Sequence, residues 1–349
     1  MIQIDELLRK AVADEASDLH LSVASPPVYR INGQLERYGD ELLSNEQTET
    51  IARQLLGKQW ETFLENREHD FAYEIEGVSR FRMNLFYQKG AVSLAIRVIP
   101  REIPTVEELD LPLILQSLMI RPHGLILVTG PTGSGKSTTL AAMIDYANKN
   151  FNKHIITLED PIEYIHSHGQ SIVQQREVGE DTNQFADGLR ASLRQDPDII
   201  LVGEMRDLET IQTAITAAET GHLVLATLHT NSAAQTITRI IDVFPPHQQE
   251  QIRIQLASVL EAVISQRLFR RVDRIGRIAA TEILISHPSV GNLIRNNKID
   301  QIRNVLQTSK SLGMHTLAMS IQELLNKGII SREDALPYIT NAGDYHGDV

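Results

Sequence analysis

The chain has 349 residues, of which 42% are hydrophobic and 22% charged, and 33 Lys and Arg against 45 Asp and Glu give a formal net charge of −12. This length predicts roughly two or three domains with sizeable cores, and the acidic balance argues against a general nucleic-acid binder. The sequence contains no cysteine, which excludes disulfides, cysteine zinc sites and thiol catalysis.

The N-terminal segment predicts an amphipathic helix and not a targeting signal. Charged residues interrupt the apolar ones in MIQIDELLRKAV, whereas a signal peptide needs an unbroken apolar core. No apolar run approaches the length of about 18 residues that a membrane span requires. We therefore expect no transmembrane helix, and any membrane association would come through a protein partner.

Residues 1–100 predict a first α/β domain. A helix over about 4–16 precedes a strand over 18–23, in which apolar and polar residues alternate. Asn32-Gly33 predicts a hairpin turn. A helix over 44–65 follows, and three further strands complete this domain.

Prolines mark a linker over 101–112, and the sequence after it predicts a second domain over 113–349. Short apolar runs in this domain lack polar alternation, which is typical of strands buried on both faces of a parallel sheet. Helical stretches separate the runs, so we expect an α/β sheet with right-handed crossovers. The predicted strands are 125–129, 154–158, 199–203 and 223–228, and the segments 246–267 and 300–349 predict mainly helices.

A phosphate-binding loop directly follows the first of these strands, and a helical stretch follows the loop. Its glycines allow backbone N–H groups to point at phosphate oxygens, and the helix N-terminus adds partial positive charge. Lys136 would reach the β- and γ-phosphates, and Ser137 would bind Mg²⁺. The motif predicts nucleotide binding without saying what the energy is used for. It comprises Gly130, Pro131, Thr132, Gly133, Ser134, Gly135, Lys136, Ser137 and the adjacent Thr138.

Acidic residues follow the next two predicted strands, where ligand groups gather in open α/β sheets. Glu159, Asp160 and Glu163 come after strand 154–158 and could orient Mg²⁺ or activate water. A cluster that favours a helix N-terminus is the alternative interpretation. Glu204 follows strand 199–203, one residue later than the usual aspartate and after a glycine, and its position predicts a role in holding Mg²⁺ or positioning water.

Histidines flank the predicted strand 223–228. His229, at its carboxyl end, could contact the γ-phosphate or the attacking water, and a histidine that is hydrogen-bonded within its loop is the equal alternative. His222, before the strand, is the weaker candidate.

Taken in order along the chain, six segments resemble the type II/type IV secretion ATPases, and among them the subgroup that retracts type IV pili. The resemblance extends from about residue 1 to 330. It implies a PAS-like N-terminal domain, a RecA-like P-loop ATPase domain with a helical C-terminal extension, and a hexamer that hydrolyses Mg-ATP. The segments are ASDLHLS (16–22), PPVYRING (26–33), GPTGSGKST (130–138), ITLEDPIEY (156–164), LRQDPDIILVGEMRD (193–207) and TGHLVLATLHTNSA (220–233).

The resemblance also implies roles for the residues at the strand ends. Glu163 matches the general base of the family's acidic segment, and Glu204 matches its atypical second-motif glutamate. His222 and His229 match its histidine segment.

Arg82 and Arg97 are the residues whose interpretation the resemblance changes. Phosphoryl transfer commonly uses an arginine from elsewhere in the chain or from a neighbouring subunit. From the residues alone, these are surface strand arginines that pair with Glu74 or Glu76. By resemblance, they match arginines of the N-terminal domain that reach the nucleotide.

The resemblance favours pilus retraction over assembly. Assembly and type II secretion ATPases usually carry a four-cysteine zinc insert and an extra N-terminal domain, and this chain has no cysteine. The segment SLGMHTL (311–317) also resembles the retraction subgroup. One segment argues against retraction, because SVGNLI (289–294) keeps only half of the subgroup's AIRNLI motif.

The implied partners are a homo-hexamer of this chain, an inner-membrane pilus platform protein and the pilus machinery. The implied location is cytoplasmic, peripheral to the membrane-embedded machine. The rival functions are a pilus-assembly or type II secretion ATPase and, from another class, a non-hydrolysing nucleotide-binding regulatory scaffold. The acidic balance disfavours a nucleic-acid translocase.

Overall fold

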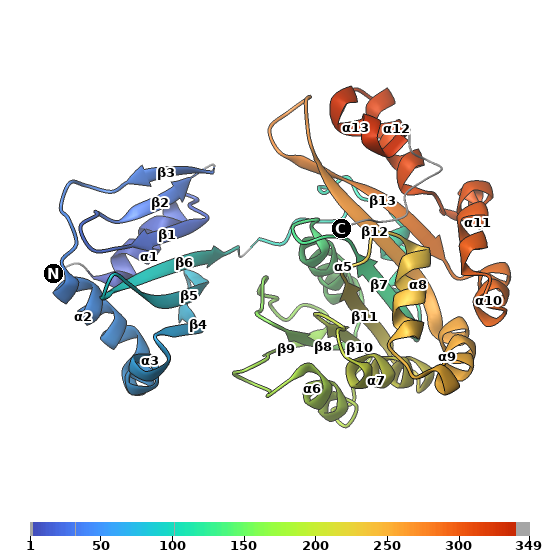
Figure 1. Ribbon diagram of the computed structural model, residues 1–349, viewed down its shortest axis with the longest axis horizontal. Coiled ribbons are helices and arrows are strands. Elements are labelled where there is room, and N and C mark those ends of the chain that lie inside the picture. Colours follow the sequence, from blue (N-terminus) through green and yellow to red (C-terminus); the bar gives the residue numbers. More distant parts are fainter. Residues whose placement is uncertain (1–2, 32, 101, 340–349) are drawn as a thin grey trace. The chain divides into compact units, whose positions relative to one another are not determined.

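The computed structural model describes residues 3–31, 33–100 and 102–339. It divides into two compact units, residues 1–102 with 163–165 and residues 103–162 with 166–349 (Figure 1). The predicted turn residue Asn32, Arg101 of the predicted linker and the predicted helical tail 340–349 lie outside the described residues.

The N-terminal unit combines helices with a six-stranded antiparallel sheet in the order β3-β2-β1-β6-β5-β4. Its apolar core contains Leu19, Phe63, Phe81 and Met83. The elements are α1 (Ile4–Ala13), β1 (Asp18–Leu21), β2 (Val28–Ile31), β3 (Gln34–Arg37), α2 (Asn45–Leu56), α3 (Trp60–Asn66), β4 (Glu68–Ile75), β5 (Ser79–Gln88) and β6 (Ala91–Ile99).

The helix predicted over 44–65 is divided into α2 and α3. Ser44 starts α2 with a capping box, in which its side chain accepts from the Gln47 N–H and the Gln47 side chain accepts from the Ser44 N–H. Gly57 ends α2 at a φ of +52°, which a glycine adopts without steric cost. The predicted helical segment is therefore present, but it consists of two α-helices joined by a short 3-10 turn over 57–59.

The larger unit contains a seven-stranded sheet in the order β13-β12-β7-β11-β10-β8-β9, parallel except for the β12–β13 pair. All four predicted strands are present, and their ends lie within one residue of the prediction, which confirms the predicted α/β class. The strands are β7 (Gly124–Thr129), β8 (His154–Glu159), β9 (Ile172–Glu177), β10 (Ile199–Val202), β11 (Leu223–Leu228), β12 (Leu260–Arg270) and β13 (Arg277–Ile285).

The helical prediction over 246–267 is wrong in its second half. Helix α9 (Pro246–Val259) ends where β12 begins, and β12 runs parallel to β7 on one side and antiparallel to β13 on the other. Ala262, Val263 and Ile264 are buried. A short apolar run of this kind cannot be told from a buried helix by its periodicity.

The remaining helices cover the faces of the sheet, and α12 and α13 lie beside the β12–β13 hairpin (Figure 1). The mainly helical prediction over 300–349 is confirmed as far as residue 339. Within the described ranges, no helix is both long and apolar enough to cross a bilayer. The helices are α4 (Ile114–Leu118), α5 (Lys136–Asn150), α6 (Phe185–Ser192), α7 (Leu208–Glu219), α8 (Ala233–Asp242), α10 (Pro288–Arg295), α11 (Ile302–Thr308), α12 (Leu317–Asn326) and α13 (Arg332–Ile339).

The parallel register brings the carboxyl ends of the central strands to one edge of the sheet. Thr129 at the end of β7 lies opposite Leu228 at the end of β11. Val202 at the end of β10 lies between Ala226 of β11 and Leu158 of β8. The residues that follow these strands therefore emerge side by side.

A buried carboxylate joins β13 to the starts of two helices. Glu282 accepts hydrogen bonds from the N–H of Ala233 at 2.8 Å and of Leu317 at 3.5 Å, which are the first residues of α8 and α12. Helix N-termini favour negative charge, but burial has the larger effect and raises the pKa of Glu282.

We expect Glu282→Gln to raise the melting temperature at pH 7.5, because it removes a buried charge and its amide oxygen can still accept from the Ala233 N–H. The variant loses only the weaker, 3.5 Å bond from the Leu317 N–H. Because the folded-state pKa of Glu282 is raised, its ionised form destabilises the folded wild type at higher pH. This destabilisation is removed as pH falls through the folded-state pKa and the carboxylate becomes protonated. The advantage of the variant should therefore disappear towards the ordinary glutamate pKa of 4.5. Melting curves recorded across this pH range check the expectation. Each kcal/mol added to the free energy of unfolding should raise the melting temperature by about 2–4 °C.

Glu261→Gln on β12 is the matched control, because the Glu261 carboxylate pairs with Arg121 at 3.2 Å and gains from its charge. It should give no increase in melting temperature at pH 7.5. A lower melting temperature for Glu282→Gln than for the wild type at pH 7.5 would contradict the expectation.

Candidate nucleotide-binding site

The predicted phosphate loop connects β7 to α5 and depends on two glycine conformations. Gly130 has a φ of +144°, and a Cβ there would lie 2.3 Å from the Gln266 carbonyl oxygen and 2.6 Å from Ser134 Oγ. Gly135 precedes α5 at a φ of +88°. Both positions require glycine, so the loop can turn its backbone N–H groups towards a bound anion at the helix N-terminus.

The lysine of the loop is already turned towards the loop's own backbone. Lys136 is buried, and its Nζ donates to the carbonyl oxygens of Gly130 at 2.9 Å and Pro131 at 3.1 Å. Its charged end is therefore held at the loop, where it can exchange these carbonyls for phosphate oxygens.

Gln266 of β12 braces the loop, a contact that the sequence reasoning missed. Its Nε2 donates to the Ser134 carbonyl oxygen at 2.8 Å, and its Oε1 accepts from Thr139 Oγ1 at 3.0 Å. One residue earlier, the Ser265 and Thr129 hydroxyls lie 2.7 Å apart. Because β12 was predicted as helix, nothing in the sequence placed Gln266 next to the loop.

Glu204 emerges at the same edge of the sheet, after β10. The preceding Gly203 donates its N–H to Leu158 O at 2.7 Å, and a Cβ at Gly203 would lie 3.0 Å from that oxygen. Thr227 Oγ1 donates to Gly203 O at 2.5 Å. Gly203, the extra residue between the strand and the acid, is thus the one that fits between β8 and β11. Glu204 itself forms an ion pair with Arg206.

His229 lies beside Glu204, with its Nε2 3.6 Å from a carboxylate oxygen of Glu204. Partial burial, and next the charges of Lys136 and Arg206, lower the pKa of His229. The imidazole is therefore neutral at pH 7, and it can donate or accept a hydrogen bond without adding charge. The structure brings His229, Glu204 and the lysine of the loop together.

His222 lies at the opposite end of β11. Its carbonyl oxygen accepts from the Gly124 N–H at 3.1 Å, at the start of β7, and its Nδ1 lies 2.9 Å from Ala217 O. Seven residue steps of about 3.3 Å along the strand separate it from His229 by roughly 23 Å. His222 is therefore not part of the same site within one chain.

The acidic segment after β8 is held by hydrogen bonds at its start. Glu159 accepts from Thr157 Oγ1 at 2.7 Å and from Gln175 Nε2 at 3.2 Å. The Ile162 N–H donates to Glu177 Oε2 at 3.2 Å. Glu163 follows Ile162 and is exposed.

Arg82 and Arg97 face each other across β5 and β6 in the N-terminal unit, and both are exposed. Arg97 pairs with Asp18 of β1 at 3.1 Å, and not with the glutamates of β4. Their part in nucleotide chemistry stays a prediction from the resemblance.

Two cavities lie in the larger unit, and the second includes loop residues in its lining. One, of about 520 Å³, is lined by Glu204, His229, Arg206 and Arg239 among others. The other, of about 470 Å³, lies between the start of α5, the β12–β13 hairpin and residues 108–111. The size and position of this second cavity suit the nucleoside part of a nucleotide whose phosphates occupy the loop.

The donor set at the loop fits Mg²⁺ as a nucleotide site holds it. Mg²⁺ in such sites usually takes one or two carboxylates together with substrate phosphates and waters. Ser137 is the second residue of α5, and the Glu204 carboxylate follows β10, which β11 separates from β7 in the sheet. Within the described part of the chain, no group of three or more His, Asp or Glu forms a protein-only metal site.

Residues 1–335 match the model of the family described as "Type II/IV secretion system protein". The chain is 49% identical over 335 residues to the "Type IV pilus retractation ATPase PilT" of Pseudomonas aeruginosa, covering 96% of this chain and 97% of that protein. It is 48% identical to a "Twitching motility protein" of Neisseria gonorrhoeae, covering 88% of this chain and 83% of that protein.

A solved structure described as the pilus retraction motor PilT with bound ADP matches with a TM-score of 0.90 at 48% identity, covering 97% of each chain. The predicted resemblance is confirmed, as is the predicted α/β fold with a RecA-like ATPase domain.

We expect Gly130→Ala to destabilise the nucleotide-free protein more than Gly133→Ala. Alanine at 130 meets the Gln266 carbonyl at 2.3 Å, whereas a Cβ at 133, where φ is +77°, meets nothing within 4 Å. Gly133→Ala should therefore lower stability only by the left-handed backbone strain of about 1–2 kcal/mol. Gly130→Ala should add to that strain the cost of displacing β12. Melting temperatures without nucleotide check this order, and equal losses would refute the account of Gly130.

Proposed function

Because the chain belongs to the type II/IV secretion system protein family, we propose that it is an ATPase that powers the retraction of type IV pili and so drives twitching motility. The observation that carries the proposal is the meeting of the phosphate loop, Glu204 and His229 at one edge of the parallel sheet. The full-length similarity to a pilus retraction ATPase supports the retraction role, and the ADP in the related structure supports nucleotide binding.

The loop binds the triphosphate. Backbone N–H groups of residues 133–138 donate to its oxygens, and Lys136 exchanges its contacts to Gly130 and Pro131 for the β- and γ-phosphates. The hydroxyl of Ser137 and the carboxylate of Glu204 hold Mg²⁺, which neutralises charge on the phosphates. The nucleoside takes the cavity beside Thr138 and Thr139.

Hydrolysis transfers the γ-phosphoryl group to water. Glu163 accepts a proton from the water whose oxygen forms the new bond to the γ-phosphorus, and ADP leaves as that phosphorus loses its bond to the bridging oxygen. His229 donates a ring N–H to a γ-phosphate oxygen and so responds to whether that group is present. Arg82 and Arg97 add positive charge in the transition state when the N-terminal unit closes on the nucleotide.

The motor acts as a homo-hexamer in the cytoplasm. Its partner is an inner-membrane platform protein of the pilus machinery, which attaches it peripherally to the membrane. Nucleotide-driven movement of one unit against the other supplies the mechanical work. Hydrolysis is favoured over a regulatory scaffold, because a scaffold that only binds nucleotide has no use for Glu163 together with Glu204 and His229.

We expect Glu163→Gln to lower the rate of phosphate release from Mg-ATP by at least about 100-fold, because the amide cannot accept the proton of the attacking water. ADP affinity should stay at the wild-type level, since binding depends on the loop. Phosphate-release kinetics and titration calorimetry measure the two quantities.

Glu180→Gln serves as the matched control. Glu180 is an exposed acid that follows β9 at the same edge of the sheet, and its loss should leave turnover unchanged. Turnover of Glu163→Gln at the wild-type rate would remove Glu163 from the proposed mechanism.

A further inference from the structure

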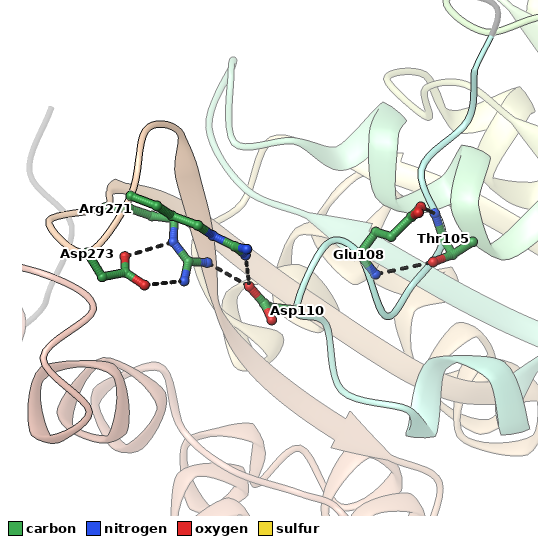
Figure 2. A network of polar contacts seen from close by, with 6 residues as sticks. Thr105, Glu108, Asp110, Arg271 and Asp273 are labelled. Carbon is green, nitrogen blue, oxygen red and sulfur yellow. Dashed lines mark hydrogen bonds and ion pairs between the residues drawn. The ribbon is translucent and has the colours of Figure 1, made fainter.

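The second half of the predicted linker is a short helical turn that is capped at both ends. At its start, the Thr105 N–H donates to Glu108 Oε2 at 2.8 Å and the Glu108 N–H donates to Thr105 Oγ1 at 3.2 Å, which is a capping box (Figure 2). At its end, the Leu111 N–H donates to Val106 O at 3.0 Å and the Asp110 N–H to Glu107 O at 2.9 Å. This pair of bonds is the Schellman motif.

Asp110 occupies the position of this motif where glycine is the usual residue. Its φ is +53°, in the left-handed region, which costs a residue with a side chain about 1–2 kcal/mol relative to the right-handed one. Aspartate tolerates this conformation better than most residues, but glycine would adopt it without that cost. The side chain at 110 must therefore supply something that offsets the strain.

The Asp110 carboxylate connects the turn to the β12–β13 hairpin. One of its oxygens, Oδ2, accepts from Arg271 Nη1 at 2.6 Å and from Arg274 Nη2 at 2.8 Å. Arg271 also binds Asp273 through two hydrogen bonds of 2.9 and 2.7 Å, so it lies between two carboxylates (Figure 2). Only 7% of the Arg271 side chain is exposed, compared with 59% for Arg274.

The two carboxylates of this network have different positions. Asp273 belongs to the hairpin itself and fixes Arg271 within it, whereas Asp110 lies 161 residues away in the sequence and links Arg271 to the turn. Removing either acid takes one partner from Arg271, but only Asp110 joins the two arginines to the turn, which is also anchored by the buried Val106 and Leu111.

The network spans the cavity beside the phosphate loop. Residues 108–111 form one wall, and Leu268, Arg271 and Arg274 of the hairpin contribute to another. The start of α5, with Gly135 and Thr138, forms a third. The contacts of Asp110 with Arg271 and Arg274 therefore join the first two walls directly.

We propose that Asp110 is a positioning residue for the nucleotide. Through Arg271 and Arg274 it holds the turn 105–111 against the hairpin at the distance at which the cavity accepts the nucleoside. The proposal rests on the proposed nucleotide-binding function and adds to it the way in which the nucleoside wall is kept in place. According to the proposal, Asp110 affects only the binding of the nucleoside. The phosphates bind the loop, and Gln266 holds the loop without any contact through Asp110.

The test compares the affinities of ADP and pyrophosphate for the full-length chain by titration calorimetry. Both probes carry two phosphates, and only ADP carries a nucleoside. Asp110→Asn should weaken ADP binding about tenfold, or about 1.4 kcal/mol, and leave pyrophosphate binding unchanged. Asp110→Gly should do the same, and it guards against misfolding because glycine suits the left-handed backbone.

Asp273→Asn is the matched control, and it should keep ADP affinity within about twofold of the wild type, because it leaves the turn attached to the hairpin. The proposal is overturned if both Asp110 variants bind ADP as tightly as the wild type does. It is also overturned if Asp273→Asn weakens ADP binding as much as the Asp110 variants do, or if the Asp110 variants weaken pyrophosphate binding as much as ADP binding. A wild-type chain that bound neither probe would instead overturn the proposed function, and this inference with it.

Discussion

Two hydrogen bonds from the Gln266 side chain hold the phosphate loop to a neighbouring strand, and the geometry of the site depends on them. Gln266 donates to Ser134 O and accepts from the Thr139 hydroxyl, so it fixes the loop and the first turn of α5 together. The backbone of the same residue leaves no room for a side chain at Gly130. A loop held in this way can present its N–H groups to an anion without first becoming ordered, which is how preorganised sites save binding energy.

The parallel register then determines what surrounds the loop. Because β7, β11, β10 and β8 end at the same edge, Glu204 and His229 come from separate strands and still lie 3.6 Å apart. Gly203 and Thr227 fix the backbone before Glu204. The charge of Lys136 contributes to the lowered pKa of His229, so the loop influences the protonation of a residue on another strand. These positions place a carboxylate and an imidazole from two different strands beside each other at the edge of the sheet where the loop lies.

Features encoded within one stretch of sequence were predictable, and features that join distant stretches were not. The loop motif and the strands 125–129, 154–158 and 223–228 are continuous patterns, and each was found where it was predicted. Strand β12 carries the same apolar composition as a buried helix, so its assignment failed, and the brace by Gln266 was lost with it. Its contact to Ser134 spans 132 residues. His222 and His229 flank the same strand, but they lie at its opposite ends, so the structure places only His229 beside Glu204.

The proposal that this chain hydrolyses ATP as an assembled ring is tested by the rate of phosphate release from Mg-ATP, measured across a series of protein concentrations. If subunits complete each other's sites, the rate per subunit should rise with concentration until assembly is complete. A rate per subunit that stays constant over the whole series would contradict the assembled motor. ATP binding without phosphate release at any concentration would contradict hydrolysis itself.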